Sequence, residues 1–339
     1  MAGAAARLKY SLITFVAQKL LTDSMLWYKE AKKYFISPRP QESDLVKTYP
    51  VRKSLPIRIF FPSTYNPSQP TTTKLPTLLT IHSGGYVVGT ATENDSWNRT
   101  FSTRHSFLVI ALNYAKAPGN PFPGPIYDVE ALIGYILSDS SLPVDSNHVA
   151  LAGWSAGGNL VLAASQLPSL RGRIHAVVPF YPLTDRTTTS DEKACGRWYK
   201  PSLGGPDTRL DNPLVSPFFY TRGEPAELDM LAPEALWMAC KLAGKRIPGL
   251  DEVVGRHEKV GKGLLTTEGD ERFAWETTME DGSRYRWLLV PDTIHGYDQN
   301  NFEGLTRDPV LMEDARIKAA KVIDLVGTWL LEGPLKAGP

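Results

Sequence analysis

From about residue 56 onward, short runs of apolar, β-forming residues alternate with stretches whose apolar residues recur at helical spacing. The run 106–115 is apolar almost throughout, which is typical of a strand covered on both faces. Strands separated by helices in this way predict a mostly parallel sheet with helices on both sides. The predicted strands are 56–61, 75–85 (ending in a glycine turn), 106–115, 148–153, 174–182, 262–270 and 285–292, and the predicted helices are 123–139, 156–167 and 309–332.

Two regions interrupt this alternation. The first 50 residues are mainly helical in pattern, and residues 183–260 are rich in proline, glycine and charge around a helical stretch. Because an α/β sheet needs a cover over the carboxyl ends of its strands to form a pocket, we interpret both regions as cap material. The alternative for 236–260 is a surface insertion without a role. The predicted division is N-terminal cap helices over 1–50, a core over 51–185 and 210–335, and lid insertions over approximately 185–210 and 222–260.

The N-terminal residues resemble a signal peptide, since two basic residues precede an apolar run. The run is interrupted at Gln18 and Lys19, no small-x-small cleavage pattern follows, and its apolar positions suit one face of a helix. We therefore predict an amphipathic helix. No apolar run in the sequence approaches the ~20 residues of a membrane span, so no stable membrane insertion is expected.

Charge and cysteine content narrow the function classes. The 339 residues carry a formal net charge of +1 with scattered charges, so no nucleic-acid-binding face is expected. Cys195 and Cys240 have no second Cys or His at metal-ligand spacing, which predicts no metal site. We expect both cysteines to be free thiols in a reducing, cytoplasmic compartment; the alternative is a single disulfide between them.

The stretch Gly153-Trp154-Ser155-Ala156-Gly157 follows a predicted strand and precedes a predicted helix. A serine at such a strand-to-helix turn is held in a strained conformation with its Oγ above the sheet edge. The following amides lie at a helix N-terminus, where they are free to donate to a developing oxyanion. We predict that Ser155 is a nucleophile; the alternative is a glycine-rich turn that happens to contain serine.

A nucleophilic serine needs a histidine base and an orienting carboxylate. His295 follows the last predicted strand and is the only histidine at the carboxyl edge without another assignment. The others lie at strand starts (His105, His148, His175), in a strand-end turn where a loop-bracing role is predicted (His82), or in the charged insertion (His257).

The carboxylate is expected after the preceding strand, where Asp270 is chosen and Glu268 and Glu271 are close competitors. Asp292 is too close in sequence to face the His295 ring. The resulting chain order of serine, acid and histidine is that of an α/β-hydrolase.

The remaining requirement is charge stabilisation. The strand over 75–81 ends in His-Ser-Gly-Gly-Tyr, where Gly84 and Gly85 allow backbone amides to approach a substrate oxygen. With Ala156 they form a predicted oxyanion hole of three donors; the alternative is an ordinary tight turn. The predicted substrate-binding residues are Tyr86, Trp154 and Trp198, and the aromatic residues of the lid are Trp27, Tyr28, Trp198 and Tyr199.

At these residues the chain resembles the hormone-sensitive-lipase-like family of α/β-hydrolases, which includes bacterial and fungal esterases and plant carboxylesterases. The motifs are HSGG, NYAKAPGNPFPGPIYD, GWSAGG, TTEGDE with IHGYD, and SPFF, and the resemblance covers about 76–298. It implies an α/β-hydrolase fold with a mostly parallel eight-stranded sheet, helices on both faces and a helical cap. It also implies a cofactor-free acyl-ester hydrolase with an acyl-enzyme intermediate, in which Ser155 is the nucleophile, Asp270 the acid, His295 the base, and Gly84, Gly85 and Ala156 the oxyanion donors.

Three departures from the family pattern matter. Ser83 replaces the first glycine of HGGG, and Trp154 replaces the aspartate that usually precedes the serine. The long stretch between SPFF and 262–270 is atypical. Fungal members are the most similar in HGYD and VVPFYPLTD, and some of those act in secondary metabolism.

The expected function is therefore a serine carboxylesterase that cleaves small to medium, apolar esters or lactones, with a small-molecule ester as its partner. One alternative is a biosynthetic enzyme that performs acyl transfer, lactonisation or cyclisation, which a water-excluding lid would favour. Another is a non-enzymatic ligand-binding protein on the same fold, as in the plant gibberellin receptor. Whether the chain forms a homodimer is left open.

Overall fold

The computed structural model describes residues 42–67, 73–184, 231–249, 261–265, 269–299 and 306–336, with isolated residues between 12 and 31 and between 252 and 255. The described residues between 12 and 31 have helical backbone, as the pattern predicts. The division into cap, core and lid remains a prediction. The predicted lid over 185–210, the start of the insertion over 222–260, and the individual residues Cys195, Trp198, Tyr199, His257 and Glu268 lie outside the described residues.

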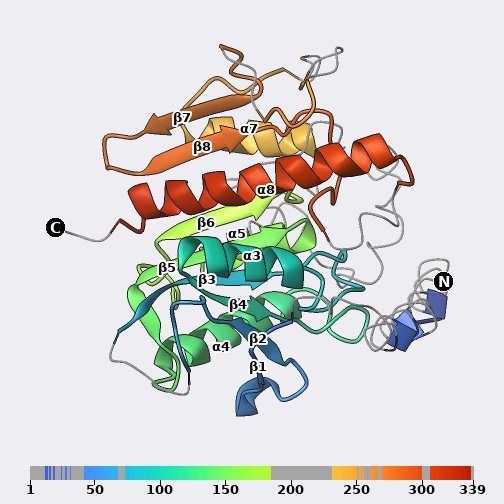
Figure 1. Ribbon diagram of the computed structural model, residues 1–339, viewed down its shortest axis with the longest axis vertical. Coiled ribbons are helices and arrows are strands. Elements are labelled where there is room, and N and C mark those ends of the chain that lie inside the picture. The colour runs from blue at the N-terminus through green and yellow to red at the C-terminus, as the bar shows by residue number, and fades with distance from the viewer. Residues whose placement is uncertain are drawn as a thin grey trace, which may run out of the picture.

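The main sheet has six strands in the order β1-β2-β4-β3-β5-β6 (Figure 1). Strands β4, β3, β5 and β6 run parallel, whereas β2 pairs antiparallel with β1 and with β4. The bounds are β1 (Leu45–Lys47), β2 (Ile57–Phe60), β3 (Leu75–Ile81), β4 (Leu108–Leu112), β5 (Val144–Trp154) and β6 (Ala176–Phe180).

Helices cover both faces of this sheet. On one face α4 (Gly124–Ser138) and α5 (Ala156–Ala164) contribute Val129 and Leu160 to a core cluster that includes Leu79. On the other face α3 (Asp95–His105) and α8 (Pro309–Glu332) contribute Phe101 and Val326 to a cluster that includes Leu78. Because successive strand residues point to opposite faces, Leu78 and Leu79 enter different clusters. The predicted layers are confirmed, although the rather polar α3 was not predicted.

The last two strands form a separate sheet. β7 (Ala274–Thr278) and β8 (Arg284–Leu288) pair antiparallel as a hairpin that lies beyond α8, at the opposite end of the molecule from β1 (Figure 1). Asp281-Gly282 is a strong hairpin turn signal, and Gly282 adopts φ 83°. The described part of the predicted strand 262–270 is not in a strand. The described strands therefore divide into six and two, where a single sheet of eight was expected.

A third cluster joins the hairpin to α7 (Ala232–Leu242), a helix inside the predicted lid insertion. Its buried residues include Ala235 and Leu236 of α7 together with Phe273, Trp287 and Leu289. The described part of this insertion is therefore packed onto the hairpin by apolar contacts.

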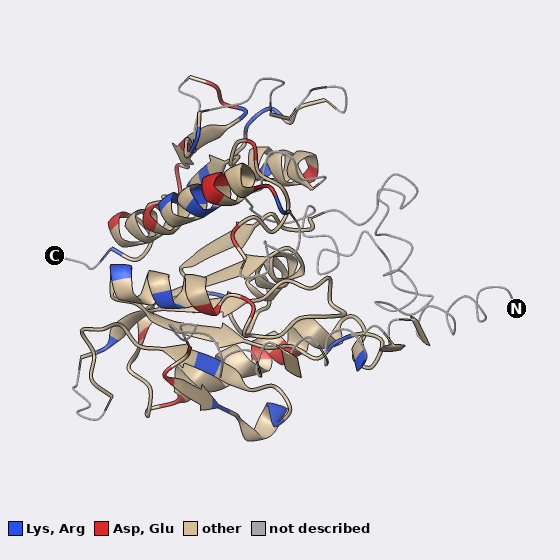
Figure 2. Ribbon diagram, turned by 45° about the vertical axis from the view of Figure 1, so that its right-hand side comes forward, with Lys and Arg blue, Asp and Glu red and all other residues tan. Residues whose placement is uncertain are grey.

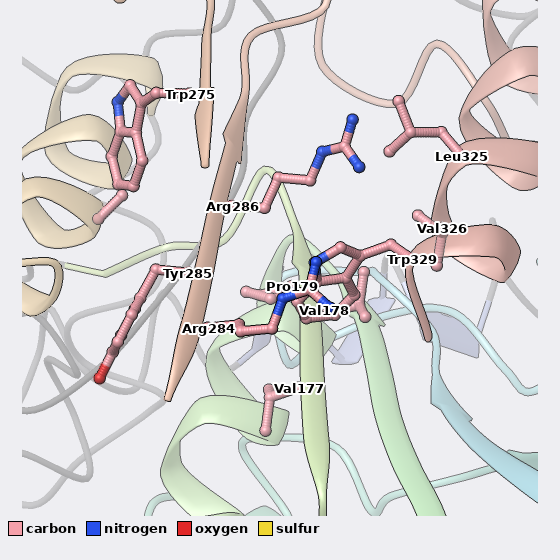
Figure 3. A pocket seen from close by; sticks show the side chains of 11 residues that line it. Val177, Val178, Pro179, Trp275, Arg284, Tyr285, Arg286, Leu325, Val326 and Trp329 are labelled. Carbon is pink, nitrogen blue, oxygen red and sulfur yellow. The ribbon is translucent and has the colours of Figure 1, made fainter. Parts of the chain in front are cut away.

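A small cavity of about 30 Å³ lies between β6, β8 and α8 (Figure 3). Val178 of β6, Arg284 of β8 and Trp329 of α8 line it, and none of the predicted site residues does.

Lys, Arg, Asp and Glu positions are interspersed along the described chain, with both signs of charge present on α8 (Figure 2). Among the described residues, no helix is long and apolar enough to cross a membrane.

Candidate active site

Ser155 occupies the turn between β5 and α5. Its φ of 53° and ψ of −114° are a strained combination for a residue with a side chain. The turn is held from both sides, because the Ser155 amide donates to Phe180 O at 2.9 Å and the Asn159 amide donates to Ser155 O at 3.0 Å. Ser155 is only partly buried. It therefore stands at the carboxyl edge of the sheet, immediately before the N-terminus of α5.

Close backbone contacts require the glycines around Ser155. A Cβ atom on Gly153 would lie 2.3 Å from Gly157 O, and a Cβ atom on Gly157 would lie 2.2 Å from Ile81 O. Such separations are far inside van der Waals contact, so the turn can close only with glycine at both positions. The second contact also packs the first turn of α5 against the end of β3.

The loop that follows β3, residues 82–89, is the predicted oxyanion loop. Gly84, Gly85 and Tyr86 have φ values of 114°, 57° and 69° in succession. A Cβ atom on Gly84 would lie 2.1 Å from Val88 O, so this position requires glycine. Ser83 has no positive φ, which explains how a serine can stand there in place of glycine. Tyr86, a predicted substrate-binding residue, is buried.

His82 and Lys116 brace the base of the oxyanion loop, as predicted for His82. Because the Ser83 carbonyl can only accept, His82 Nδ1 donates to it at 2.6 Å, and Nε2 is then free to accept from Lys116 Nζ at 3.2 Å. Lys116 also donates to Asn113 Oδ1 at 3.0 Å and lies 3.8 Å from the centre of the Tyr114 ring. Burial, and then the Lys116 charge, lower the pKa of His82 well below its usual range.

Lys116 makes the stability of the protein depend on pH. Burial lowers the pKa of Lys116 from 10.5 to about 7, although Asp128 and Glu93 oppose this shift. At a pH between these two pKa values, Lys116 is protonated in the unfolded chain and deprotonated in the folded chain. The contribution of Lys116 to the free energy of unfolding therefore rises with pH, by at most about 1.4 kcal/mol per pH unit. We expect Lys116→Met to remove this rise. Urea unfolding of both proteins from pH 6.5 to 10 tests it, and identical pH dependence would contradict it.

His295 lies in the loop that follows β8. Its ring packs against that of Tyr181, with the ring centroids 4.6 Å apart. Tyr181 directly follows Phe180, whose carbonyl accepts from the Ser155 amide. The predicted nucleophile and base are thus carried to the same edge of the sheet by neighbouring residues.

A buried ion pair on α8 anchors the loop that carries His295. Lys318 is fully buried, and its Nζ donates to Asp314 at 2.6 Å and to Pro291 O at 2.7 Å. Asp314 also accepts from the Gly263 amide at 2.6 Å. Helix α8 therefore holds both the segment before the predicted acid and the segment before His295.

Replacing Lys318 with methionine is expected to lower the free energy of unfolding by about 3–5 kcal/mol, because Asp314 is left as a buried, unpaired charge. Adding Asp314→Leu to that variant should recover part of the loss. Urea unfolding measures both changes, and a loss below about 1 kcal/mol in the single variant would refute the anchoring role.

The predicted acid Asp270 lies in the turn before β7. Its carboxylate accepts from the Arg272 amide at 3.0 Å and from Arg272 Nη2 at 2.6 Å. The competitor Glu271 is exposed and lies 3.2 Å from Lys245 Nζ. The structure places both carboxylates beside basic side chains, and the acid that orients His295 stays a prediction.

Asp298, Tyr181 and Gln299, which the sequence analysis did not select, join the segments of this site. Asp298 accepts from Trp154 Nε1 at 2.8 Å and from the Tyr181 hydroxyl at 2.5 Å, and Gln299 bonds both Tyr181 and Ser83. Burial raises the pKa of Asp298, and burial together with the Asp298 charge raises that of Tyr181. A signal existed: an aspartate closes the HGYD motif in a chain whose usual aspartate before the serine is tryptophan.

The N-terminal segment also reaches this edge of the sheet. Gln18 Nε2 donates to Val87 O and to Ala117 O, each at 2.6 Å, and so bridges the loops that follow β3 and β4. Trp27 and Tyr28, which the sequence analysis assigned to a lid, are 73% and 58% exposed.

Behind the His295 loop, α3 and α8 enclose an open cavity of about 580 Å³ that Asp298 and Gln299 also line. Of the two cysteines, Cys240 is a buried free thiol.

Comparison with known proteins agrees with this geometry. Residues 78–242 match a family model described as alpha/beta hydrolase fold. The chain therefore has the α/β-hydrolase fold, whose sheet also includes β1 and β2 and whose core includes α8. It superposes on a hyperthermophilic esterase from Pyrobaculum calidifontis with a TM-score of 0.64 at 16% identity, covering 94% of this chain and 93% of that one. The predicted fold is confirmed.

Two curated relatives are each similar to part of the chain. An arylesterase of Saccharolobus solfataricus is 33% identical over 38% of this chain and 40% of its own length. An arylacetamide deacetylase of Rattus norvegicus is 31% identical over 38% of this chain and 33% of its own length. The chain thus matches well under half of each of these relatives. The resemblance to hormone-sensitive-lipase-like hydrolases is confirmed, whereas a fungal character, a role in secondary metabolism and a cytoplasmic location stay predictions.

Proposed function

We propose that this protein is a serine esterase of the carboxylesterase type that hydrolyses small to medium, apolar esters. The observation that carries the proposal is Ser155 at φ 53° on a turn that only glycine neighbours permit, between a strand and the N-terminus of a helix. A strained, fully specified turn that presents a partly exposed hydroxyl at a sheet edge suits a nucleophile. The oxyanion loop and the His295 loop lie at the same edge.

In the proposed reaction, Ser155 Oγ attacks the acyl carbon of the ester while His295 takes the hydroxyl proton. The carbonyl oxygen becomes an oxyanion that accepts from the backbone amides of Gly84, Gly85 and Ala156. The alcohol leaves with the proton returned by His295, and an acyl-serine remains. Water, deprotonated by His295, then attacks the acyl-serine and releases the acid and the free serine.

Asp270 is the proposed acid that orients the imidazole, with Glu268 and Glu271 as the competing carboxylates. Asp270 Oδ2 accepts from Arg272 Nη2 at 2.6 Å, and a carboxylate has acceptor sites enough to bind an imidazole N–H as well. Substitution of each carboxylate in turn by its amide would identify the acid, since only that change should lower kcat by several orders of magnitude.

The names of the relatives favour ester substrates for this chain as well. They include an arylesterase, a carboxylesterase of Mycobacterium tuberculosis and an ethyl acetate hydrolase of Pseudomonas putida. The aromatic residues Tyr86 and, in the proposed lid, Trp198 suit an apolar acyl or alcohol group. Trp154 was also predicted to bind substrate, but its side chain is fully buried against Trp97 and Phe180 in the core.

Labelling with a fluorophosphonate, followed by peptide mapping, tests the nucleophile. We expect the label on Ser155 and rapid hydrolysis of short p-nitrophenyl esters. Labelling without ester hydrolysis would favour the acyl-transfer alternative, and ligand binding without labelling would favour a receptor. Label on another serine would refute the proposed site.

A further inference from the structure

The side chain of Asp298 lies at the junction of two catalytic segments. Trp154, the last residue of β5, directly precedes the nucleophile and donates its indole N–H to Asp298 Oδ2 at 2.8 Å. Tyr181, which packs on His295, donates its hydroxyl to Asp298 Oδ1 at 2.5 Å. Asp298 itself is three residues beyond His295. One carboxylate therefore joins the turn of Ser155, the end of β6 and the loop of His295.

The same network continues into the oxyanion loop. Gln299 Nε2 donates to the Tyr181 hydroxyl at 3.1 Å, and Ser83 Oγ donates to Gln299 Oε1 at 3.0 Å. Ser83 immediately precedes Gly84, the first of the proposed backbone donors. Each donor in this hydrogen-bond network has one acceptor, and both carboxylate oxygens of Asp298 accept a hydrogen bond. The network is therefore complete with Asp298 ionised.

Two of the network residues, Ser83 and Trp154, are also departures from the family pattern. A glycine at position 83 would have no hydroxyl to donate to Gln299. An aspartate at position 154 would offer only acceptors toward Asp298 and would place a second negative charge beside it. Ser83 and Trp154 thus supply two of the four donors in this network, and both donations would be lost with the residues that the family usually has at these positions.

We propose that Asp298 is a positioning residue that fixes the turn of Ser155, the loop of His295 and the oxyanion loop relative to one another. It touches no reacting atom and acts through Trp154, Tyr181 and Gln299. The proposal rests on the esterase function proposed above. Trp154 and Tyr181 are almost completely inaccessible, so the hydrogen bonds that hold them are not exchanged readily for water.

Steady-state hydrolysis of p-nitrophenyl esters by Asp298→Asn tests this role. The amide keeps the shape of the carboxylate but loses one acceptor and the charge. We expect kcat to fall by about 10²-fold with KM changed by less than about threefold, because misplacement of catalytic groups by fractions of an ångström affects the transition state more than substrate binding. The control is Asp324→Asn, which removes the exposed carboxylate on α8 that pairs with Arg104 of α3 and should leave kcat unchanged.

Tyr181→Phe keeps the ring against His295 and removes only the hydroxyl, so it serves as a second probe that is not expected to unfold the protein. If the network acts as a unit, the double variant with Asp298→Asn should lose little more kcat than Asp298→Asn alone. Unchanged kcat in Asp298→Asn, or fully additive losses, would overturn the proposal while leaving the esterase intact. A wild-type protein that neither hydrolyses esters nor reacts with a fluorophosphonate would instead overturn the proposed function, and this role with it.

Discussion

Replacing Ser155 with alanine is expected to lower kcat for ester hydrolysis by about 10⁴- to 10⁶-fold, because the proposed nucleophile is removed and water must attack without an acyl-enzyme. Residual turnover should come only from the oxyanion amides and from substrate binding. Stability should change little, since alanine and serine experience the same strain at φ 53°. Initial rates with p-nitrophenyl acetate or butyrate, at matched protein concentration, measure the loss.

Ser165→Ala provides the matched control for this variant. Ser165 lies just after α5, and its hydroxyl donates to Leu162 O, so the change removes a serine hydroxyl from the same helix without touching the turn. It should retain wild-type kcat and wild-type fluorophosphonate labelling. Retention of more than about a tenth of the activity by Ser155→Ala would reject a serine-esterase mechanism at this site.

Gly157→Ala is expected to destabilise the protein by about 3 kcal/mol or more and to abolish most activity. The added Cβ would lie 2.2 Å from Ile81 O and 2.6 Å from His82 O, both of which are backbone atoms. Either α5 must move away from β3, or the start of the oxyanion loop must shift. Both changes separate Ser155 from its proposed amide donors. Urea unfolding and ester hydrolysis measure the two effects.

Gly134→Ala is the control for this second prediction. Gly134 lies inside α4, and a Cβ atom there would meet nothing within 4 Å. Alanine is the better helix former, so this variant should gain about 0.5–1 kcal/mol and keep full activity. If Gly157→Ala were as stable and as active as Gly134→Ala, the close packing of α5 on β3 described above would be wrong.

Much of the fold follows from local sequence pattern. The uninterrupted apolar run around β4 requires cover on both faces, and the observed sheet has it. The glycines that flank Ser155 predict a tight strand-to-helix turn, and the structure has that turn with a positive φ at the serine. These features could be predicted because a buried strand, a helix face and a glycine turn are each specified by residues close together in the chain.

The arrangement after residue 260 could not be derived in the same way. The apolar pattern of 262–270 favours a strand, yet its described residues are held by Asp314 and Lys321 on α8, while β7 forms later and pairs with β8. An apolar run predicts that a segment will be buried, but it does not predict which other segment will pack against it. The proposed acid Asp270 and its competitor Glu268 fall in this segment, which is why the sequence alone left the choice of acid open.

The sequence by itself determined the layered α/β architecture, the turn that carries Ser155 and the order of the candidate catalytic segments, because each depends on contacts between near neighbours. Only the tertiary structure decided that Trp154 donates to Asp298, that Ser83 reaches Gln299, and that Lys318 anchors the loop of His295. The first two pairs are separated by 144 and 216 residues. Hydrogen-bond partners at such separations are set by how packed segments meet, and a polar side chain carries no local pattern that names its distant partner.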